Sequence, residues 1–471
     1  MIQIRNAWDR RTGAHVVAAL LIGLALRLFF VFCYPAADLD SELYQDLGRS
    51  LVEKHTYVYD FGSGLVPTDI RVPGYPLFLG FIYLFSHSPK AILVVQALVD
   101  LGGCLLLAVL AAVLAPEESR KRVAIVALWL GATCPFVANY AALALTEVLA
   151  TFLTTAALLI LVCANRREFE TATGEGSWKF WFLGGVLVGL GALVRPETPI
   201  MLAAPAIALG LRWFKPAHWL LLIRTGLLLA AGLLLALLPW AARNWVSMNK
   251  VQFLTTRYFQ SPGSYIPEGF YAWTHTWLTS YGDGERVMNR LEEGPLQVAD
   301  FPSSAFDSPQ ESEQVASLLE GQHTEPYVIG EEPDAQFAAL ARERTARRPV
   351  RTYLAVPLRR MLTLWFTPRT ELLPLSGNWW PAQLAWTEVD ADWAFGFLFA
   401  TLNFLYLGLA LVGGIRLWKA NGVALLVAFV VVRTIFIAVE HNSVEPRLVL
   451  PCVPAVLALG ALTWSARVSG S

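Results

Sequence analysis

Long apolar runs recur along most of the chain and are separated by short polar stretches. A helix needs about 20 apolar residues to cross a bilayer core of ~30 Å. Ten runs approach that length: 15–34, 90–114, 123–140, 143–164, 179–195, 198–213, 219–240, 393–415, 422–440 and 448–465. Another run, 351–366, carries Arg359 and Arg360 near its middle, where paired charges are costly in lipid, so we expect an interfacial helix there. The pattern predicts an all-α polytopic membrane protein with about ten transmembrane helices, within a range of about nine to thirteen.

Lys and Arg in short loops predict the orientation, because cytoplasmic loops carry an excess of them. The basic clusters are Arg5/Arg10/Arg11, Arg120/Lys121/Arg122, Arg166/Arg167, Arg212/Lys215 and Arg416/Lys419. With ten spans all of them fall on one side, which we take to be the cytoplasm. We interpret 15–34 as a retained span rather than a signal peptide, because no small-residue cleavage site follows it.

The expected spans divide the chain into four parts. Residues 1–240 form an N-terminal transmembrane module with an outer loop at 35–89, and residues 393–471 form the C-terminal transmembrane helices. Between them lie an extracytoplasmic loop region at 241–350 and an interfacial segment at 351–392. The loop region holds nine Lys/Arg and fifteen Asp/Glu, a net charge of -6. We expect its Pro- and Gly-rich middle, 294–314, to be a loose surface excursion and 335–347 to be helical.

Composition supports this class of protein. The chain is 55% hydrophobic and 15% charged, against about 25% charged in soluble domains. Its net charge of -1 argues against a nucleic-acid partner. The five cysteines all lie in apolar runs and none forms a CxxC pair, so we interpret them as small core residues.

The first outer loop opens with two acids, Asp38 and Asp40, directly after the first span. Tyr44 and Leu47 follow at helical spacing, which predicts an amphipathic helix along the membrane surface. Near the N-terminus of such a helix the dipole favours a negative charge. The alternative is that Asp40 or Ser41 is only a helix cap.

Arginines and acids recur at the outer ends of other spans. Arg71 precedes a rigid Pro-Gly-Tyr-Pro turn and could bind a phosphate bidentately, or could be an interface anchor. The other polar residues at outer ends are Thr146, Glu147, Arg195, Glu197, Arg243, His441, Glu445 and Arg447. For each charged one, an internal salt bridge is the alternative. Because the predicted topology places all of them at one face, we expect acids for proton transfer and arginines for an anion to converge there.

The same residues follow a family pattern. The motifs are Asp40-x-x-x-Tyr44-x-Asp46-x-x-Arg49, Arg71-x-Pro-Gly-Tyr-Pro76, Thr146-Glu147, Arg195-Pro196, Pro239-Trp-x-x-Arg243-Asn244, and Arg447 before the last span. In these motifs, over essentially its full length, the chain resembles the GT-C superfamily of polytopic glycosyltransferases. It is most similar to the branch of family 39, the protein O-mannosyltransferases, and to the related bacterial lipid A aminoarabinose transferases. Two departures leave the catalytic acid and base open: the acids are spread as Asp38, Asp40 and Glu42, and the basic residue is an arginine two before proline rather than a lysine next to it.

The resemblance implies a donor sugar on a polyprenyl phosphate and transfer at the extracytoplasmic face of a bacterial inner membrane. The acceptor would be a lipid, a glycan or a protein of the cell envelope. In this interpretation Asp40 is the general base and Glu147 positions the acceptor or helps to bind a metal. Arg71, Arg195, Arg243 and Arg447 would stabilise the phosphate, with Asp38, Tyr44, Tyr75 and His441 in support. No cofactor is demanded, and a divalent metal ion is left open.

A second class of function also explains outer arginines: a flippase or transporter of an anionic lipid-linked glycan. Transporters commonly contain repeated halves with charges near the membrane midplane. No such repeat is evident in this chain, and the long outer loop favours the enzyme.

Overall fold

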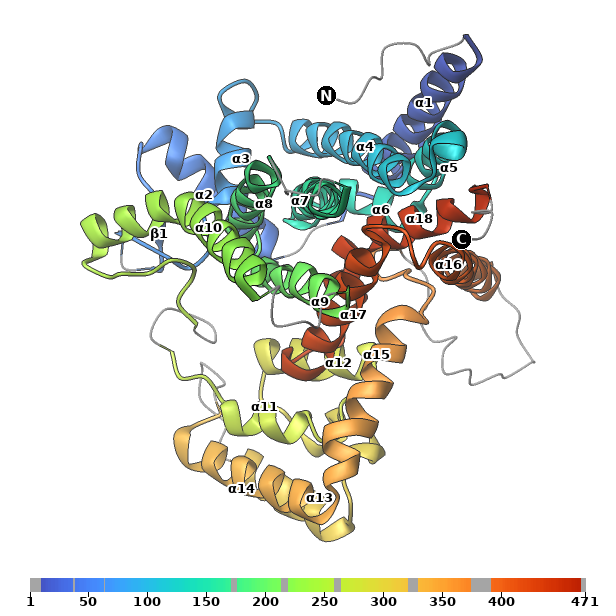
Figure 1. Ribbon diagram of the computed structural model, residues 1–471. Helices are drawn as coiled ribbons and strands as arrows, with labels where there is room; N and C mark the ends of the chain where they lie inside the picture. The colour runs from blue at the N-terminus through green and yellow to red at the C-terminus, as the bar shows by residue number, and fades with distance from the viewer. Residues whose placement is uncertain are drawn as a thin grey trace.

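The computed structural model describes residues 10–36, 39–62, 64–170, 176–212, 219–257, 264–320, 329–373 and 391–466. Most of them are helical (Figure 1). The α-helices are α1 (Arg10–Cys33), α2 (Leu39–Glu53), α3 (Gly74–Tyr83), α4 (Pro89–Leu114), α5 (Arg120–Ala132), α6 (Pro135–Ala138), α7 (Glu147–Glu170), α8 (Ser177–Ala192), α9 (Ala203–Arg212), α10 (Trp219–Met248), α11 (Glu268–Thr274), α12 (Tyr281–Glu293), α13 (Pro309–Leu319), α14 (Glu331–Arg347), α15 (Val356–Trp365), α16 (Ala391–Arg416), α17 (Val423–Glu440) and α18 (Val453–Ala461).

Shorter elements connect these helices. They are the 3-10 turns η1 (Glu117–Ser119), η2 (Asn139–Ala142), η3 (Thr198–Leu202), η5 (Val298–Asp300), η6 (Ser303–Ala305), η8 (Pro446–Cys452) and η9 (Leu462–Trp464), and the π-helical turn η7 (Arg351–Ala355). Strands β1 (Val58–Asp60) and β2 (Leu65–Pro67) form an antiparallel hairpin in the first outer loop, with Tyr59 opposite Val66.

The described helices make the chain a polytopic membrane protein. Seven are long and apolar enough to cross a membrane: α1, α4, α7, α10, α16, α17 and the final unit Pro446–Trp464. An eighth candidate pairs Glu117–Ala132 with Pro135–Ala142, bent by 50°. The bend falls before Pro135, which has no N–H to donate and disfavours helical geometry at the preceding Cys134.

All ten predicted runs contain helix, but seven or eight candidates are fewer than the expected ten. The difference comes from α8, with 16 residues, and from the short helical segment Thr198–Leu211. The Arg195-Pro196 turn separates these two helices and limits the length of each.

Buried polar contacts and close backbone approaches fix the helices against each other. Arg27 of α1 is fully buried and its Nε lies 2.6 Å from Asp100 Oδ2 of α4, while its Nη1 donates to Ala132 O of α5 at 2.7 Å. Gly232 of α10 packs on the backbone of α8, where an added Cβ would lie 2.2 Å from Phe182 O. Only glycine allows α8 and α10 to meet so closely.

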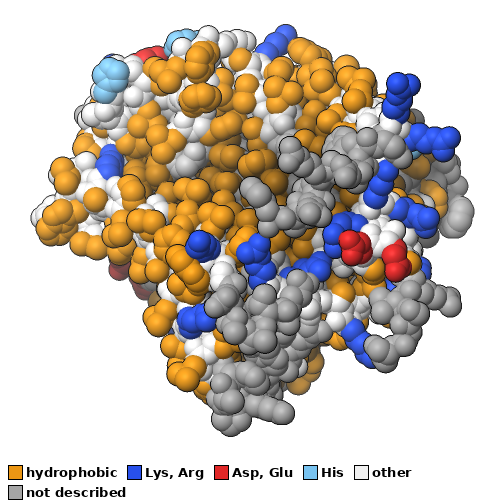
Figure 2. All heavy atoms as spheres, turned by 45° about the horizontal axis from the view of Figure 1, so that its top comes forward, with side chains coloured by type: hydrophobic (Ala, Val, Ile, Leu, Met, Phe, Trp, Pro, Cys, Tyr) orange, Lys and Arg blue, Asp and Glu red, His pale blue; other side chains and the backbone are white. Residues whose placement is uncertain are grey.

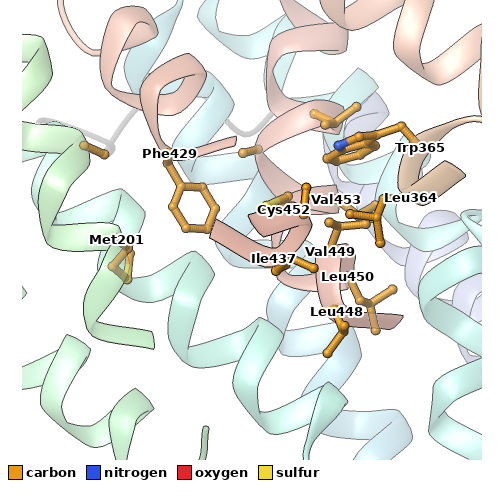
Figure 3. Packing of buried hydrophobic residues seen from close by; sticks show 14 of the residues in the cluster. Met201, Leu364, Trp365, Phe429, Ile437, Leu448, Val449, Leu450, Cys452 and Val453 are labelled. Atoms are coloured by element: carbon orange, nitrogen blue, oxygen red, sulfur yellow. The ribbon is translucent and has the colours of Figure 1, made fainter. Parts of the chain in front are cut away.

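The outer surface of the helices is apolar, as a lipid environment requires. Figure 2 shows a broad hydrophobic face, with most Lys and Arg side chains along its right-hand margin and across its lower part. Inside, residues of α17 and of the final span pack with η3 and α15, as Phe429, Met201, Trp365 and Cys452 illustrate (Figure 3). This packing joins the C-terminal helices to the N-terminal module.

Residues 264–320 and 329–347 form a packed helical part rather than a loose excursion; we call it the outer part, after its predicted position. Helices α11 to α14 lie together to one side of the long apolar helices (Figure 1). Phe270, Trp273 and Phe337 are fully buried, with ring centroids 5.3 Å apart in two of the three pairs. Arg344, also buried, pairs with Glu311 and Asp307. The prediction for 294–314 was therefore wrong, because Phe301 and Phe306 inside that stretch pack on Trp273, a core that the Pro and Gly content obscured. The helix expected at 335–347 is confirmed as part of α14.

The run 351–366 is helical, as η7 followed by α15. Tyr353, Leu354 and Leu362 are exposed on it, whereas Arg360 is 2% exposed. Arg360 Nη2 donates to the carbonyls of His441 and Ser443. One of the two central arginines is thus satisfied inside the protein, and the interfacial position of this helix stays a prediction.

Candidate active site

The first outer helix, α2, carries Asp40 in its first turn beside Arg71. Arg71 Nη2 donates to Asp40 Oδ1 at 2.6 Å, and the Arg71 guanidinium lies 5.8 Å from the ring centroid of Tyr44. Tyr44 packs edge-on against Tyr75, with centroids 5.2 Å apart, and Tyr75 donates to Gln96 Oε1 at 2.7 Å. Asp40, Arg71 and the two tyrosines that were expected to support them therefore lie together. Asp38 lies outside the described residues.

The Pro-Gly-Tyr-Pro turn docks on the end of α8. Gly74 N donates to Leu193 O at 2.6 Å, and an added Cβ at Gly74 would lie 2.5 Å from the same oxygen. Any larger residue would push the turn away. This contact fixes Arg71, three residues before the glycine, near Arg195, two residues beyond Leu193.

Arg195 joins two carboxylates below this turn. Its Nη1 donates to Glu147 Oε1 at 2.9 Å, and its Nε donates to Glu197 Oε1 at 2.7 Å. Arg433 of α17 donates from Nη2 to the same Glu197 oxygen at 3.2 Å. Burial opposes ionisation of Glu197, but Arg195 and Arg433 hold its pKa at about 2. The ion pairs that the sequence left as an alternative are thus present, as one continuous network.

Tyr44 connects the two groups electrostatically. Burial raises the pKa of Tyr44; Asp40 and Glu147 add to this effect, while Arg71 and Arg195 oppose it. The charges of all four side chains therefore act on the hydroxyl of one buried tyrosine.

Arg243 occupies a different position. It donates to the carbonyl of Thr68 at 2.8 Å and to that of Tyr57, and lies between the rings of Tyr57 and Trp240 at 5.3 and 5.1 Å. These contacts hold the outer-loop segment that leads to Arg71. They favour a role in shaping the loop, and contact with a phosphate stays a prediction.

The segment 441–447 presents the last predicted residues. Ser443 Oγ donates to Glu445 Oε1 at 2.7 Å, and Arg447 pairs with Glu445. Burial works against ionisation of Glu445, but Arg447 and the Ser443 hydroxyl lower its pKa. Burial lowers the pKa of His441, although Glu445 and Glu197 act against this. Glu445 is therefore an anion beside a neutral His441.

Arg360 of α15 and His275 of the outer part both bind this segment. Arg360 binds two of its carbonyls, and His275 Nε2 donates to Asn442 Oδ1 at 3.1 Å. Burial lowers the pKa of His275 to about 4, and the positive charge of Arg360 adds to this effect. These contacts hold the segment that carries Arg447.

A cavity of about 640 Å³ opens between this segment and the end of α1. It is lined by Cys33–Ala36, Tyr140, Leu143, Tyr281, Gly284, Glu285, Met288, Glu371–Leu373 and Ser443–Arg447. Tyr140 donates to Glu371 Oε1 at 2.8 Å, and lies within reach of the charges of Glu147 and Arg447. Of the residues singled out from the sequence that the structure describes, Glu445 and Arg447 line this cavity; Tyr140, Tyr281, Glu285 and Glu371 were not predicted.

The carboxylates do not form an evident metal site. In the described ranges no group of three or more His, Cys, Asp or Glu side chains is placed to hold a metal ion. A ligand set that includes Asp38 is not covered by this observation, and the metal stays open.

Comparison with known proteins places the fold. No family model matches the chain, and no curated protein matches it. The oligosaccharyltransferase AglB from Archaeoglobus fulgidus, solved in complex with an inhibitory peptide and a dolichol-phosphate, is similar with a TM-score of 0.52 and 14% identity over 97% of this chain and 50% of that one. The apo form of the same enzyme has a TM-score of 0.51 and 14% identity, over 98% of this chain and 50% of that one. ArnT from Cupriavidus metallidurans bound to undecaprenyl phosphate has a TM-score of 0.40 and 13% identity, over 95% of this chain and 77% of that one.

The chain spans about half the length of the archaeal oligosaccharyltransferase. At such low identity the likeness concerns the fold alone: the chain has a fold similar to that of this archaeal membrane oligosaccharyltransferase.

Proposed function

We propose that this protein transfers a sugar from a polyprenyl-phosphate donor to an acceptor at the extracytoplasmic face of a bacterial inner membrane. The observation that carries the proposal is a set of three arginine–carboxylate pairs: Arg71–Asp40, Arg195–Glu147 and Arg447–Glu445. The last of these pairs lines the cavity. Support comes from the fold, which is similar to that of an oligosaccharyltransferase solved with a dolichol-phosphate. The relationship to protein O-mannosyltransferases is part of the same proposal and rests on the sequence motifs.

The arginines suit the leaving group. When the bond between the sugar and the phosphate oxygen breaks, the polyprenyl phosphate gains negative charge, which fixed guanidinium groups stabilise. Arg195 and Arg71 approach the site from the α8 turn and the first outer loop, and Arg447 lines the cavity. The apolar outer surface provides a place for the polyprenyl chain, while the sugar enters between the outer loops.

Asp40 suits the general base. Its side chain is 42% exposed and is oriented by Arg71, so it can reach an acceptor that enters from outside. In the proposed step Asp40 takes the proton of an acceptor hydroxyl, the oxygen bonds to the anomeric carbon, and the polyprenyl phosphate departs with the bonding electrons. Glu147 is 3% exposed, and we assign it to positioning.

The test is turnover by the purified protein in nanodiscs with a polyprenyl-phosphate sugar and a lipid extract. Asp40→Asn keeps the shape of the side chain but cannot accept the proton, so turnover should fall by about 10²-fold. Glu53→Gln, at the exposed end of the same helix and outside the motif, is the control and should remain active. Asp38→Asn extends the test: a dead Asp38 variant beside an active Asp40 variant would move the base to Asp38.

Two outcomes would contradict the proposal. Transbilayer movement of the lipid-linked sugar without release of polyprenyl phosphate would identify a transporter instead. An alkaline phosphatase fusion at Ser308 that is inactive would place the outer part, and the site with it, in the cytoplasm.

A further inference from the structure

Arg195 is held by two of its three nitrogen atoms. Nε donates to Glu197 and Nη1 donates to Glu147. No described residue accepts a hydrogen bond from Nη2, and the side chain keeps 13% of its surface exposed. Because a guanidinium is planar and rigid, fixing Nε and Nη1 also fixes the direction of Nη2. The remaining nitrogen is thus a prepared donor.

Glu197 has a second anchor on the C-terminal helices. The oxygen that accepts from Arg195 also accepts from Arg433 Nη2, and Arg433 Nε donates to Leu448 O at 3.1 Å. Arg433 is 2% exposed, so it cannot follow Glu197 if that side chain moves. The two arginines and the carboxylates of Glu147 and Glu197 balance in charge, so the group can stay buried.

Glu147 accepts from Arg195 through one oxygen only. Its Oε2 is buried and has no hydrogen-bond partner in the described part of the chain. An isolated arginine–carboxylate pair favours two parallel hydrogen bonds, which would engage both Glu147 oxygens. With Nη1 already on Glu147, that arrangement would bring Nη2 to Oε2. By holding Nε, Glu197 limits the rotation of the guanidinium that this would need. Without Glu197 the guanidinium would turn toward Glu147 and withdraw Nη2.

We propose that Glu197 is a positioning residue that splits the hydrogen bonds of Arg195 between two carboxylates, so that Nη2 is presented to the phosphate of the lipid donor. The inference rests on the proposed function, because it assigns Arg195 to that phosphate. It adds a residue that touches no substrate itself. Arg433 holds Glu197 in place from the opposite side.

The experiment compares three variants in full-length protein in nanodiscs: Glu197→Gln, Glu197→Asp and Glu197→Ala. Glutamine loses the charge but keeps an oxygen at the same reach for Nε; aspartate keeps the charge but withdraws the oxygen by one methylene. Affinity for undecaprenyl phosphate is measured by native mass spectrometry, with kcat and donor KM alongside. Glu343→Ala is the control, because Glu343 pairs with exposed Arg347 in the outer part.

If Glu197 positions Arg195, glutamine should keep affinity within about 3-fold of the wild type, while aspartate and alanine lose about 10-fold or more. The donor KM should rise in parallel, with the acceptor KM unchanged. If only charge matters, aspartate will bind better than glutamine and the inference is wrong. Equal affinity of all folded variants would also overturn it. A wild-type protein that binds no undecaprenyl phosphate would instead contradict the proposed function.

Discussion

The charges around Arg195 and those around the cavity are arranged in opposite ways. Arg195, Arg433, Glu147 and Glu197 are mutually paired and balanced. The cavity lining has three carboxylates, Glu285, Glu371 and Glu445, and one arginine, Arg447. Burial, followed by those three carboxylates, raises the pKa of Tyr281, so their charges act together on one hydroxyl. The first region is a largely buried, charge-balanced network, whereas the second keeps uncompensated charge where a ligand can enter.

The largest effect should follow from removing the charge that balances the network. Arg195→Met leaves Glu147 and Glu197 with one buried arginine, and losing one partner of a buried pair costs about 3–5 kcal/mol. Size-exclusion profiles and thermal melts in detergent should show a much lower Tm. Arg49→Met, which breaks an exposed pair with Asp46, should cost about 0.5 kcal/mol or less. Equal melts for both variants would mean that the network is not structural.

A fall in pH should affect the 441–447 segment beside the cavity, which His275 contacts, but not the network around Arg195. The pKa of His275 is about 4 in the folded protein, below its ordinary 6.5, so unfolding takes up a proton between these values. Stability should therefore fall by up to about 3 kcal/mol as pH drops from 6.5 to 4. His275→Gln removes this titration and should flatten the difference in Tm. Glu197, with a pKa of about 2, stays ionised over the whole window.

A parallel pH dependence of Tm in the wild type and in His275→Gln would show that His275 does not couple acid to the 441–447 segment. Proteolysis near that segment at pH 4.5 and pH 7 provides a local readout beside Tm.

The smallest change in stability should come from the cavity. Glu371→Gln keeps an oxygen for the Tyr140 hydroxyl and reduces repulsion among the carboxylates, so Tm should stay within about 1 °C or rise. If the cavity binds the acceptor, the KM for the acceptor should increase by about 10-fold, equivalent to about 1.4 kcal/mol. Glu313→Gln, on the exposed side of α13, is the control. A large fall in Tm without a change in KM would make Glu371 a structural residue.

The sequence predicted the helical class and the meeting of Asp40, Arg71, Tyr44 and Tyr75, because those residues stand in motifs beside apolar runs. It could not predict how Arg195 divides its hydrogen bonds, since that depends on distances across three segments. Arg433 was missed although a charge inside an apolar run is itself a signal of function or pairing.

Glu371 gave no comparable signal. It follows α15 in an irregular stretch, and only tertiary contacts fix it there: Arg369 donates to Leu364 O and Pro446 O, and Asn403 donates to Thr367 O. The packing of the outer part was hidden for a similar reason. Its aromatic side chains are far apart in sequence and meet only after folding.

The Glu197–Arg433 contact can form only late in the synthesis of the protein. Residues 147–197 leave the ribosome more than two hundred residues before Arg433, since they precede it by that distance in the chain. During synthesis the N-terminal module must therefore enter the membrane with Glu197 still lacking its second arginine. Insertion of α17 closes the network at the end. A nascent chain halted before α17 would be inserted but unfinished, and open to surveillance by membrane proteases.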